Sequence, residues 1–346
     1  MTSNPLPLNL SRSGGCTLTG ALSVTTRVKN TVTIVHGPKG CTHHNFSLLH
    51  ATNLDNDRVT IPDLISTGLS ECDIIFGGEG ALERTLDAAA KRDVSTVFVL
   101  STCIADTIGD DVAAVCRKDR GVPVVPVPTG GFLGGTFQNG VNNALTAIAD
   151  LAESCPKAWC VNIIGEKNLE YEVEENFKEV TRLLAALGIP VNLRFVRDCS
   201  MADIHGLGAA RLNILRDEDL HEVGERLRLR FGTPFISSFP AGLAGTIGFL
   251  ESVADNFGVK SLRAVREEKV LQEAILREFD DISGTEISFD PSVLDSDTFR
   301  LACEVAEGIG ITIDRDGCRV PAEISPPVGT AGVRRMLHRW RRAIHA

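Results

Sequence analysis

The stretch that most constrains the fold is a short run of β-branched residues followed at once by glycines, a proline and a cysteine. Thr31–Val35 is β-branched throughout, which predicts a short buried strand. The Gly-Pro-Lys-Gly run at residues 37–40 interrupts the strand, and a helix is expected to open near Cys41 and to continue through His50. Backbone N–H groups and the helix dipole at such a start favour a thiolate, which acts either as a nucleophile or as a metal ligand.

The same order of strand, polar or glycine-containing break and helix recurs along the chain. Further strands are predicted at 72–76, 95–100, 122–127, 159–164, 191–196, 211–215 and 234–237. Helices are predicted at 81–91, 106–117, up to 152, and at 171–187, 217–230, 243–257, 262–279 and 292–307. Strands that alternate with helices through short loops imply parallel, doubly wound sheets.

The pattern restarts near residue 156 and becomes largely helical after about residue 260. A hairpin is predicted at 311–320, before a basic tail helix. We therefore predict an α/β chain with two doubly wound, Rossmann-like domains and a short, mainly helical C-terminal region. The predicted ranges are 1–155, 156–258 and 259–346.

Composition excludes several classes of protein. The formal net charge of −10 argues against a general nucleic-acid binder, which needs a basic surface. No apolar run approaches the roughly 20 residues of a membrane span, and the first residues lack a signal-peptide pattern, so a cytoplasmic protein is expected. In that compartment the ten cysteines are expected to be reduced thiols, some of them metal ligands.

Three of the cysteines fall in loops that should meet at one sheet edge. Cys16 follows two glycines, Cys41 follows the Gly-Pro-Lys-Gly run, and Cys103 follows the strand at 95–100. Three separated thiolates suit an iron–sulfur cluster, with further ligands from elsewhere or from a second subunit. The other cysteines are interpreted mainly as small buried apolar residues.

Other interpretations of Cys41 stay open. A zinc site with a nearby histidine (His36, His43 or His44) lacks any Cys-x-x-Cys or His-x-x-x-His pair, and a nucleophilic cysteine lacks a recognisable local signature. The Gly-Pro-Lys-Gly run also lacks the full phosphate-binding loop pattern, so this chain is not expected to hydrolyse ATP itself.

Four segments carry a family resemblance. In chain order they read Gly15-Cys16, Gly37-Pro38-x-Gly40-Cys41, Phe76-Gly77-Gly78-Glu79 and Ser-Thr-Cys-Ile-Ala-Asp-Thr-Ile-Gly-Asp-Asp at 101–111. In these segments, and over about residues 14 to 255, the chain resembles the catalytic component of the nitrogenase-like reductases, in particular its α-type subunit. The resemblance implies a fold of nitrogenase component 1 type and an electron-relaying iron–sulfur cluster, most simply [4Fe-4S], at a subunit interface. By match, its ligands are Cys16, Cys41 and Cys103.

Departures from that family narrow the expected substrate. Its nitrogen-reducing members hold an iron–molybdenum cofactor through a cysteine in the second domain and a histidine in the third. The corresponding strand end here, residues 212–217, has no cysteine, and the pattern of a third domain is absent or much reduced. Tetrapyrrole-reducing relatives need no such ligands, and the chain resembles most the single-subunit branch that cyclises nickel sirohydrochlorin a,c-diamide reductively in coenzyme F-430 biosynthesis.

That branch implies a homodimer, a nickel tetrapyrrole substrate and a separate iron–sulfur ATPase, similar to the nitrogenase reductase, which uses the ATP and delivers electrons. Another tetrapyrrole reductase subunit and a non-enzymatic scaffold for metal-cluster assembly are the alternatives, with a zinc-binding module further behind. No proton donor is assigned, although four side chains lie near the predicted sheet edge: His36, His43, His44 and Asp106.

The tail is strongly basic despite the acidic chain. Arginine forks bind carboxylates, so Arg334, Arg335, Arg339 and Arg341 are candidates for binding a polycarboxylate tetrapyrrole. The alternative is a solvated helix face or a subunit contact.

Overall fold

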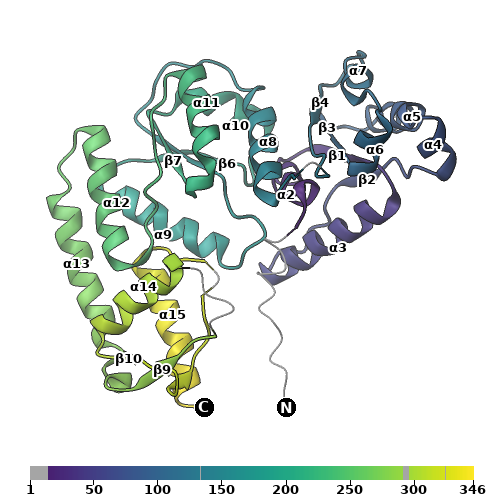
Figure 1. Cartoon of the computed structure of the whole chain (residues 1–346). Coiled ribbons are helices and arrows are strands. Elements are labelled where there is room, and N and C mark those ends of the chain that lie inside the picture. Colours follow the sequence, from purple (N-terminus) through teal and green to yellow (C-terminus); the bar gives the residue numbers. More distant parts are fainter. Residues whose placement is uncertain (1–14, 133, 291–295, 324) are drawn as a thin grey trace. The chain divides into compact units, whose positions relative to one another are not determined.

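The computed structural model describes residues 15–132, 134–290, 296–323 and 325–346, which separate into two compact units (Figure 1). The first, called the thiol unit here, contains residues 15–171 and Asn192–Phe235. The second, called the C-terminal unit, contains Glu172–Val191 and Ile236–Ala346. Among the described residues, every helix is too short or too polar to cross a membrane.

The first sheet of the thiol unit is parallel throughout. Its strands, in spatial order, are β2 (Leu64–Ser66), β1 (Thr31–His36), β3 (Thr96–Ser101) and β4 (Val124–Val127). All residues of β1 and β3 are buried, as expected for central strands covered by helices on both faces. β4 lies at the edge of the sheet, where its proline at 126 is tolerated.

The helices that accompany this sheet are mostly short. They are α2 (Thr17–Thr25), α3 (Lys39–Asp55), α4 (Glu71–Phe76), α5 (Glu79–Ala89), α6 (Cys103–Ile108), α7 (Val112–Cys116) and α8 (Phe137–Ala149). The closest pair is α2 and α8, where Gly20 and Gly140 let the two backbones touch. A Cβ atom on Gly20 would lie 1.9 Å from the Phe137 carbonyl oxygen, and one on Gly140 would lie 1.9 Å from the Thr17 carbonyl oxygen.

The second sheet of the thiol unit has the order β6 (Val191–Phe195), β5 (Val161–Ile164), β7 (Leu212–Leu215), β8 (Phe235–Ile236). Its helices are α10 (Met201–His205) and α11 (His221–Phe231), with 3₁₀ turns at Gly206–Ala209 and Glu218–Leu220. β5 and β7 pair in parallel, and the buried Asn162 amide donates to Asn213 Oδ1 at 2.9 Å across them. Asn192 in turn donates to Asn162 Oδ1 at 2.8 Å, so the polar groups at the centre of the sheet are satisfied.

The C-terminal unit is mainly helical. It contains α9 (Val173–Ala186), α12 (Gly242–Phe257), α13 (Leu262–Arg277), a 3₁₀ turn at Asp280–Ile282, α14 (Ser296–Gly308) and α15 (Gly329–Ile344). A small sheet has the order β10 (Thr312–Ile313), β9 (Glu286–Ser288), β11 (Cys318–Arg319). Trp340 is fully buried in the core of this unit beside Phe279 and Leu337. The predicted α/β class with parallel sheets is thus confirmed.

The predicted strand at 72–76 is wrong. These residues lie in α4, which has no buried residue, and the strand of this region is β2, earlier in the chain. Ser70 and Asp73 explain the helix, because they form a capping box: the Ser70 hydroxyl accepts from Asp73 N–H, and the Asp73 carboxylate accepts from Ser70 N–H at 2.8 Å.

Two further local predictions need correction. The helix predicted at 106–117 is broken into α6 and α7 by Gly109, which adopts a left-handed conformation with φ of 82°. The hairpin predicted at 311–320 does not form, because β10 and β11 both pair in parallel with β9, which lies between them. The short strand β9 was not predicted.

Candidate metal centre

Two of the three candidate thiols lie where neighbouring strands end. β1 ends at His36, and Cys41 follows in the first turn of α3. β3 ends at Ser101, and Cys103 is the first residue of α6. Because His36 pairs with Ser101 in parallel register, both thiols leave the sheet at the same carboxyl edge. Sites in parallel sheets characteristically form at this edge.

Cys16 reaches the same edge from α2. It is the N-cap of α2, and that helix runs back toward the start of β1, so its first residues lie toward the carboxyl edge. The loop residue Gly131 bridges the two regions: a Cβ atom there would lie 3.2 Å from Thr17 Oγ1 and 3.6 Å from Cys103 Sγ. The structure therefore brings together the three cysteines that the sequence singled out.

Cys16 and Cys103 lie close enough to Cys41 to affect its ionisation. Burial raises the pKa of the Cys41 thiol, and the negative charges of Cys16 and Cys103 raise it further. Burial and the two like charges thus act against the thiolate that the helix start was expected to favour at Cys41. A positively charged metal centre reverses this balance, since coordinated thiols are deprotonated.

The glycine-rich loop after β4 supplies backbone groups to the thiols. Gly131 N–H donates a hydrogen bond to Cys103 Sγ at 3.3 Å. A Cβ atom on Gly135 would lie 2.4 Å from Thr17 Oγ1, so only glycine lets the loop approach α2 this closely. Hydrogen bonds to cysteine sulfur tune the potentials of iron–sulfur clusters, and the residues present fit such a group.

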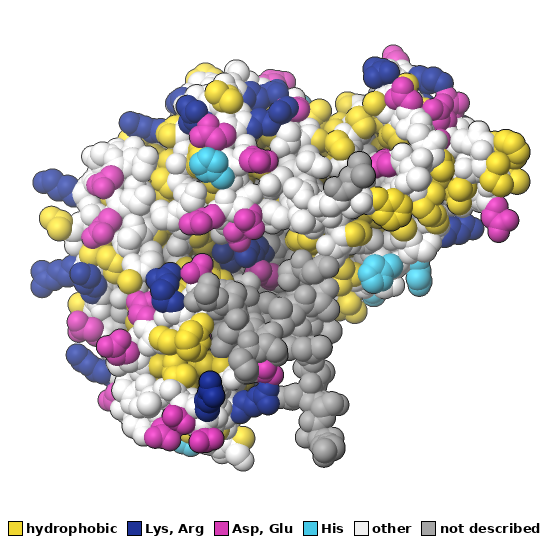
Figure 2. Space-filling view, viewed as in Figure 1, with side chains coloured by type: hydrophobic (Ala, Val, Ile, Leu, Met, Phe, Trp, Pro, Cys, Tyr) yellow, Lys and Arg dark blue, Asp and Glu magenta, His cyan; other side chains and the backbone are white. Residues whose placement is uncertain are grey.

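The zinc interpretation gains no ligand set. No three His, Cys, Asp or Glu side chains in the described ranges, the three thiols included, are arranged around a single metal ion. His43 and His44 are exposed on α3, where histidine side chains are visible at the surface in Figure 2. Burial raises the pKa of Cys116 to about 11 and that of Cys199 to about 12, so these thiols stay protonated and act as small apolar residues.

Asp110 is the residue of this region that sequence reasoning missed. Its side chain is 3% exposed, and its Oδ2 lies 2.9 Å from Nε2 of the fully buried His36. Its Oδ1 accepts a hydrogen bond from Gly78 N–H at 2.8 Å. A signal was present, because Asp110 and Gly78 belong to two of the four segments that carried the family resemblance.

The helix α4 exposes apolar side chains beside α6. Ile75 is 71% exposed and Phe76 is 85% exposed, and the space-filling view shows hydrophobic side chains at the surface over α4 (Figure 2). α4 packs against α6, which begins at Cys103. Clustered exposed apolar residues of this kind mark an interaction surface.

The four tail arginines lie on α15 and already contact acidic residues of the C-terminal unit. The pairs are Arg334–Glu278, Arg335–Glu172, Arg339–Glu172, Arg339–Glu323 and Arg341–Asp281. A substrate carboxylate would compete with these internal carboxylates for the guanidinium groups. Substrate binding by these arginines stays a prediction.

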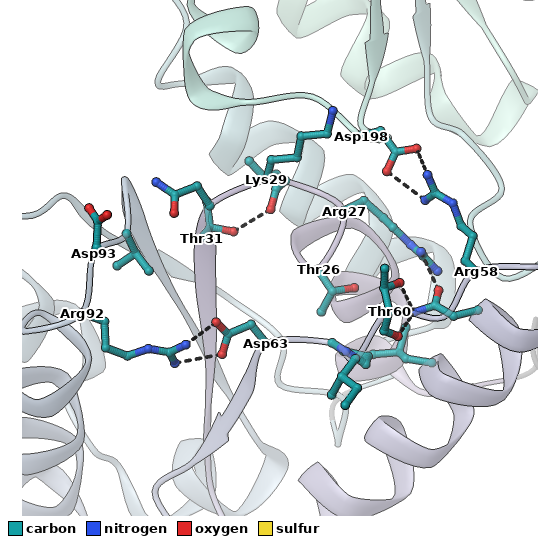
Figure 3. A pocket seen from close by; sticks show the side chains of 17 residues that line it. Thr26, Arg27, Lys29, Thr31, Arg58, Thr60, Asp63, Arg92, Asp93 and Asp198 are labelled. Carbon is teal, nitrogen blue, oxygen red and sulfur yellow. Dashed lines mark hydrogen bonds and ion pairs between the residues drawn. The ribbon is translucent and has the colours of Figure 1, made fainter.

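A cavity of about 790 Å³ lies at the opposite, amino-terminal edge of the first sheet (Figure 3). Its charged lining residues are Arg27, Lys29, Arg58, Arg92, Asp63, Asp93 and Asp198. Two of the arginines point at carboxylates, Arg58 at Asp198 and Arg92 at Asp63, which neutralises much of the positive charge (Figure 3). This cavity is separate from the thiols, and no sequence motif pointed to it.

Comparison with known proteins agrees with the geometry. Residues 16–286 match the family described as nitrogenase component 1 type oxidoreductase. The chain is 30% identical over 265 residues to the nitrogenase iron-molybdenum cofactor biosynthesis protein NifE of Clostridium pasteurianum, covering 75% of this chain and 57% of that protein. It is 26% identical over 280 residues to the nitrogenase molybdenum-iron protein alpha chain of Methanothermobacter marburgensis, covering 75% and 58%.

The fold is also that of a solved nitrogenase. The structure described as nitrogenase Cp1 at pH 5 superposes with a TM-score of 0.69 at 21% identity, over 87% of this chain and 63% of that one. The chain thus spans little more than half the length of the curated relatives that it matches. The match of the family model over most of the chain shows that it belongs to the nitrogenase component 1 type oxidoreductases.

Proposed function

We propose that this chain is the electron-accepting, catalytic component of a nitrogenase-like reductase and that Cys16, Cys41 and Cys103 are its metal ligands. The observation that supports this most is the convergence of three thiols, from three separate elements, at the carboxyl edge of one parallel sheet. An iron–sulfur cluster bound there, [4Fe-4S] in its simplest form, would supply one-electron transfer.

The residues around the thiols have the properties that such a centre needs. The Gly131 N–H donates to Cys103 Sγ, and Gly131 and Gly135 let the loop lie directly against Thr17. Cys41 and Cys103 are half-buried, whereas Cys16 is exposed. An exposed ligand next to two sheltered ones fits a centre that is completed by a second subunit, and we propose a homodimer.

We further propose that an ATP-dependent iron–sulfur protein delivers electrons at this edge. The exposed end of α4, with Ile75 and Phe76, offers an apolar surface beside the helix that begins at Cys103. The two side chains would be covered by the partner, which would also exclude water from the path of the electrons.

The proposed acceptor is nickel sirohydrochlorin a,c-diamide, on the strength of the family resemblance and one observation. The strand end at residues 212–217, where nitrogen-reducing relatives place a cofactor cysteine, has no cysteine. An acceptor that needs no such protein ligand, such as a tetrapyrrole, is consistent with that strand end.

A second candidate function is a scaffold on which a metal cluster is assembled and passed on. It is favoured by the curated relatives described as cofactor biosynthesis proteins. The same three thiols would serve it, since a scaffold also holds its cluster through cysteines.

Electron uptake by the tetrapyrrole separates the two candidates. When the anaerobically purified, chemically reduced protein is mixed with nickel sirohydrochlorin a,c-diamide, we expect the visible absorbance of the reduced centre to return to that of the oxidised form. Sirohydrochlorin without nickel is the control substrate. A cluster that moves intact to an apo-ferredoxin, with no tetrapyrrole-dependent oxidation, would instead establish the scaffold.

A further inference from the structure

His36 holds both ends of the helix that begins at Cys103. Its carbonyl oxygen accepts a hydrogen bond from Thr102 N–H at 2.9 Å, directly before Cys103. Its ring Nε2 lies 2.9 Å from Oδ2 of Asp110, which follows the other end of α6. Both partners are shielded from water, with side-chain exposures of 0% and 3%. α6 is therefore attached at its two ends to one residue of β1.

The same histidine fixes the segment that leads to Cys41. Its ring Nδ1 lies 3.1 Å from Thr67 Oγ1, and Gly37 N–H donates to that same hydroxyl oxygen at 3.0 Å. Gly37 also lies directly on Thr102, because a Cβ atom at residue 37 would be 2.2 Å from Thr102 Oγ1. The segments that lead to Cys41 and to Cys103 are thus in contact and share His36.

The turn that contains Gly78 also packs against the His36–Asp110 pair. Gly78 N–H donates to Asp110 Oδ1 at 2.8 Å, and Glu79 accepts a hydrogen bond from Asp111 N–H at 2.9 Å. A Cβ atom on Gly78 would lie 2.6 Å from Asp110 Oδ2, 2.7 Å from Leu69 Cδ2 and 3.1 Å from His36 Cε1. With its φ of −94°, alanine would be allowed by the backbone, so the neighbouring side chains alone require glycine here.

We propose that His36 and Asp110 are positioning residues for the thiol site and that their pair sets the separation of Cys41 from Cys103. The proposal rests on the proposed function only for the metal readout; the placement of the thiols can be measured without metal. A buried hydrogen-bonded pair is an expensive way to hold two segments together, because both polar groups lose their contacts with water. Hydrogen bonds are directional, so each bond made by His36 or Asp110 fixes the position of the segment that it contacts.

The test uses a matched pair of glycine substitutions. Gly78→Ala moves Asp110 away from His36 without changing either side chain, whereas Gly80→Ala adds the same methyl group two residues later, where its nearest neighbour is Arg84 Nη1 at 3.5 Å. Asp110→Asn is the milder second variant, which keeps the shape of the side chain and removes its charge. A thermal melt confirms that each variant is folded.

The first readout is the alkylation rate of the metal-free thiols by iodoacetamide, mapped by peptide mass spectrometry. The exposed Cys318 of the C-terminal unit is the internal reference. We expect the rate at Cys103, relative to Cys318, to change several-fold in Gly78→Ala and Asp110→Asn and to stay at the wild-type value in Gly80→Ala. Wild-type rates at both Cys41 and Cys103 in the first two variants would overturn the proposal.

The second readout is the electron paramagnetic resonance line shape and midpoint potential of the iron-loaded protein. We expect both to shift in Gly78→Ala and Asp110→Asn while Gly80→Ala matches the wild type. Unshifted spectra and potentials in folded, fully loaded variants would contradict the proposal. If the wild type itself binds no iron, the proposed function fails, and the alkylation rates alone decide whether the pair positions the thiols.

Discussion

Replacing Gly20 with alanine is expected to destabilise the thiol unit by about 3 kcal/mol, because the new methyl group overlaps backbone rather than a mobile side chain. Its Cβ would lie 1.9 Å from the Phe137 carbonyl oxygen and 3.1 Å from Val141 N. All of α2 is buried, so the helix cannot move outward without exposing its apolar side chains. α2 and α8 would have to separate, and Cys16 at the start of α2 would move with them.

Urea unfolding of the metal-free chain, followed by circular dichroism, measures this effect. Hydrogen exchange of the α2 and α8 amides assigns it to the helix contact, since exchange there should become faster before the rest of the chain unfolds. Gly80→Ala is the control, because it adds the same methyl group at an open position of α5. Equal stabilities of the Gly20 and Gly80 variants would contradict the packing described here.

Replacing Arg182 with methionine is expected to cost about 3 kcal/mol in the C-terminal unit at neutral pH, because two buried carboxylates lose their shared cation. Arg182 donates to Glu179 on α9 and to Glu268 on α13, each through two contacts of 2.8–2.9 Å. The two carboxylates are 5% and 3% exposed. Thr330 donates to Glu268 and Ala331 N–H donates to Glu179, so the network also anchors the start of α15.

The loss should depend on pH. Burial alone raises the pKa of Glu179, but hydrogen bonds from Arg182 and from Ala331 N–H outweigh it and hold the pKa below its usual value. In the wild type this carboxylate therefore adds stability above the unfolded pKa, and that stability is lost as the pH falls through the folded pKa. Without Arg182 burial dominates and the folded pKa rises, so the deficit is largest above about pH 5 and shrinks in acid.

Tryptophan fluorescence can follow the unfolding of the C-terminal unit and so tests this prediction. The chain has two tryptophans, and in a Trp159→Phe background the buried Trp340 of the C-terminal unit is the only one. Urea titrations at neutral pH and near pH 4 give the two free energies of unfolding. Arg263→Met, which removes an exposed partner of Glu267 on α13, should leave both unchanged. A deficit that is the same at both pH values would contradict the charge argument.

The central strands and the helices that cover them could be predicted from the sequence for a physical reason. A strand covered on both faces is rich in β-branched and apolar residues. Thr31–Val35 and 95–100 both have that composition, and both lie in central strands. Two short strands of the same chain escaped prediction. β2 is only partly buried, and β9 has three residues, so neither leaves a periodic pattern to detect.

The wrong prediction of a strand at 72–76 shows a limit of prediction from local sequence patterns. Five residues with four apolar side chains fit a strand or a short helix equally well. The signal that decides lies just outside the run, in the Ser70 and Asp73 side chains that close the first turn of α4. Ile75 and Phe76 are then left at the surface, which the assumption of a buried strand had hidden.

Some residues of the candidate site could be predicted from the sequence, and others could not. The three cysteines could be selected from the sequence because each follows a glycine pair, a glycine–proline break or a strand end, and such positions meet at one edge of a parallel sheet. The His36–Asp110 pair joins residues 74 positions apart, and only the folded chain shows that they touch. The cavity at the amino-terminal edge of the first sheet is likewise lined by residues from several separate segments, so no local sequence pattern predicts it.

The central claim is that Cys16, Cys41 and Cys103 hold an iron–sulfur cluster, and electron paramagnetic resonance of the anaerobically purified, reduced protein tests it most directly. We predict a cluster signal with matching iron and labile sulfide in the wild type, and its loss or a clear change in each of Cys16→Ala, Cys41→Ala and Cys103→Ala. Cys318→Ala, at an exposed position of the C-terminal unit, should keep the wild-type signal. A wild-type signal in all three of the thiol-site variants would contradict the claim.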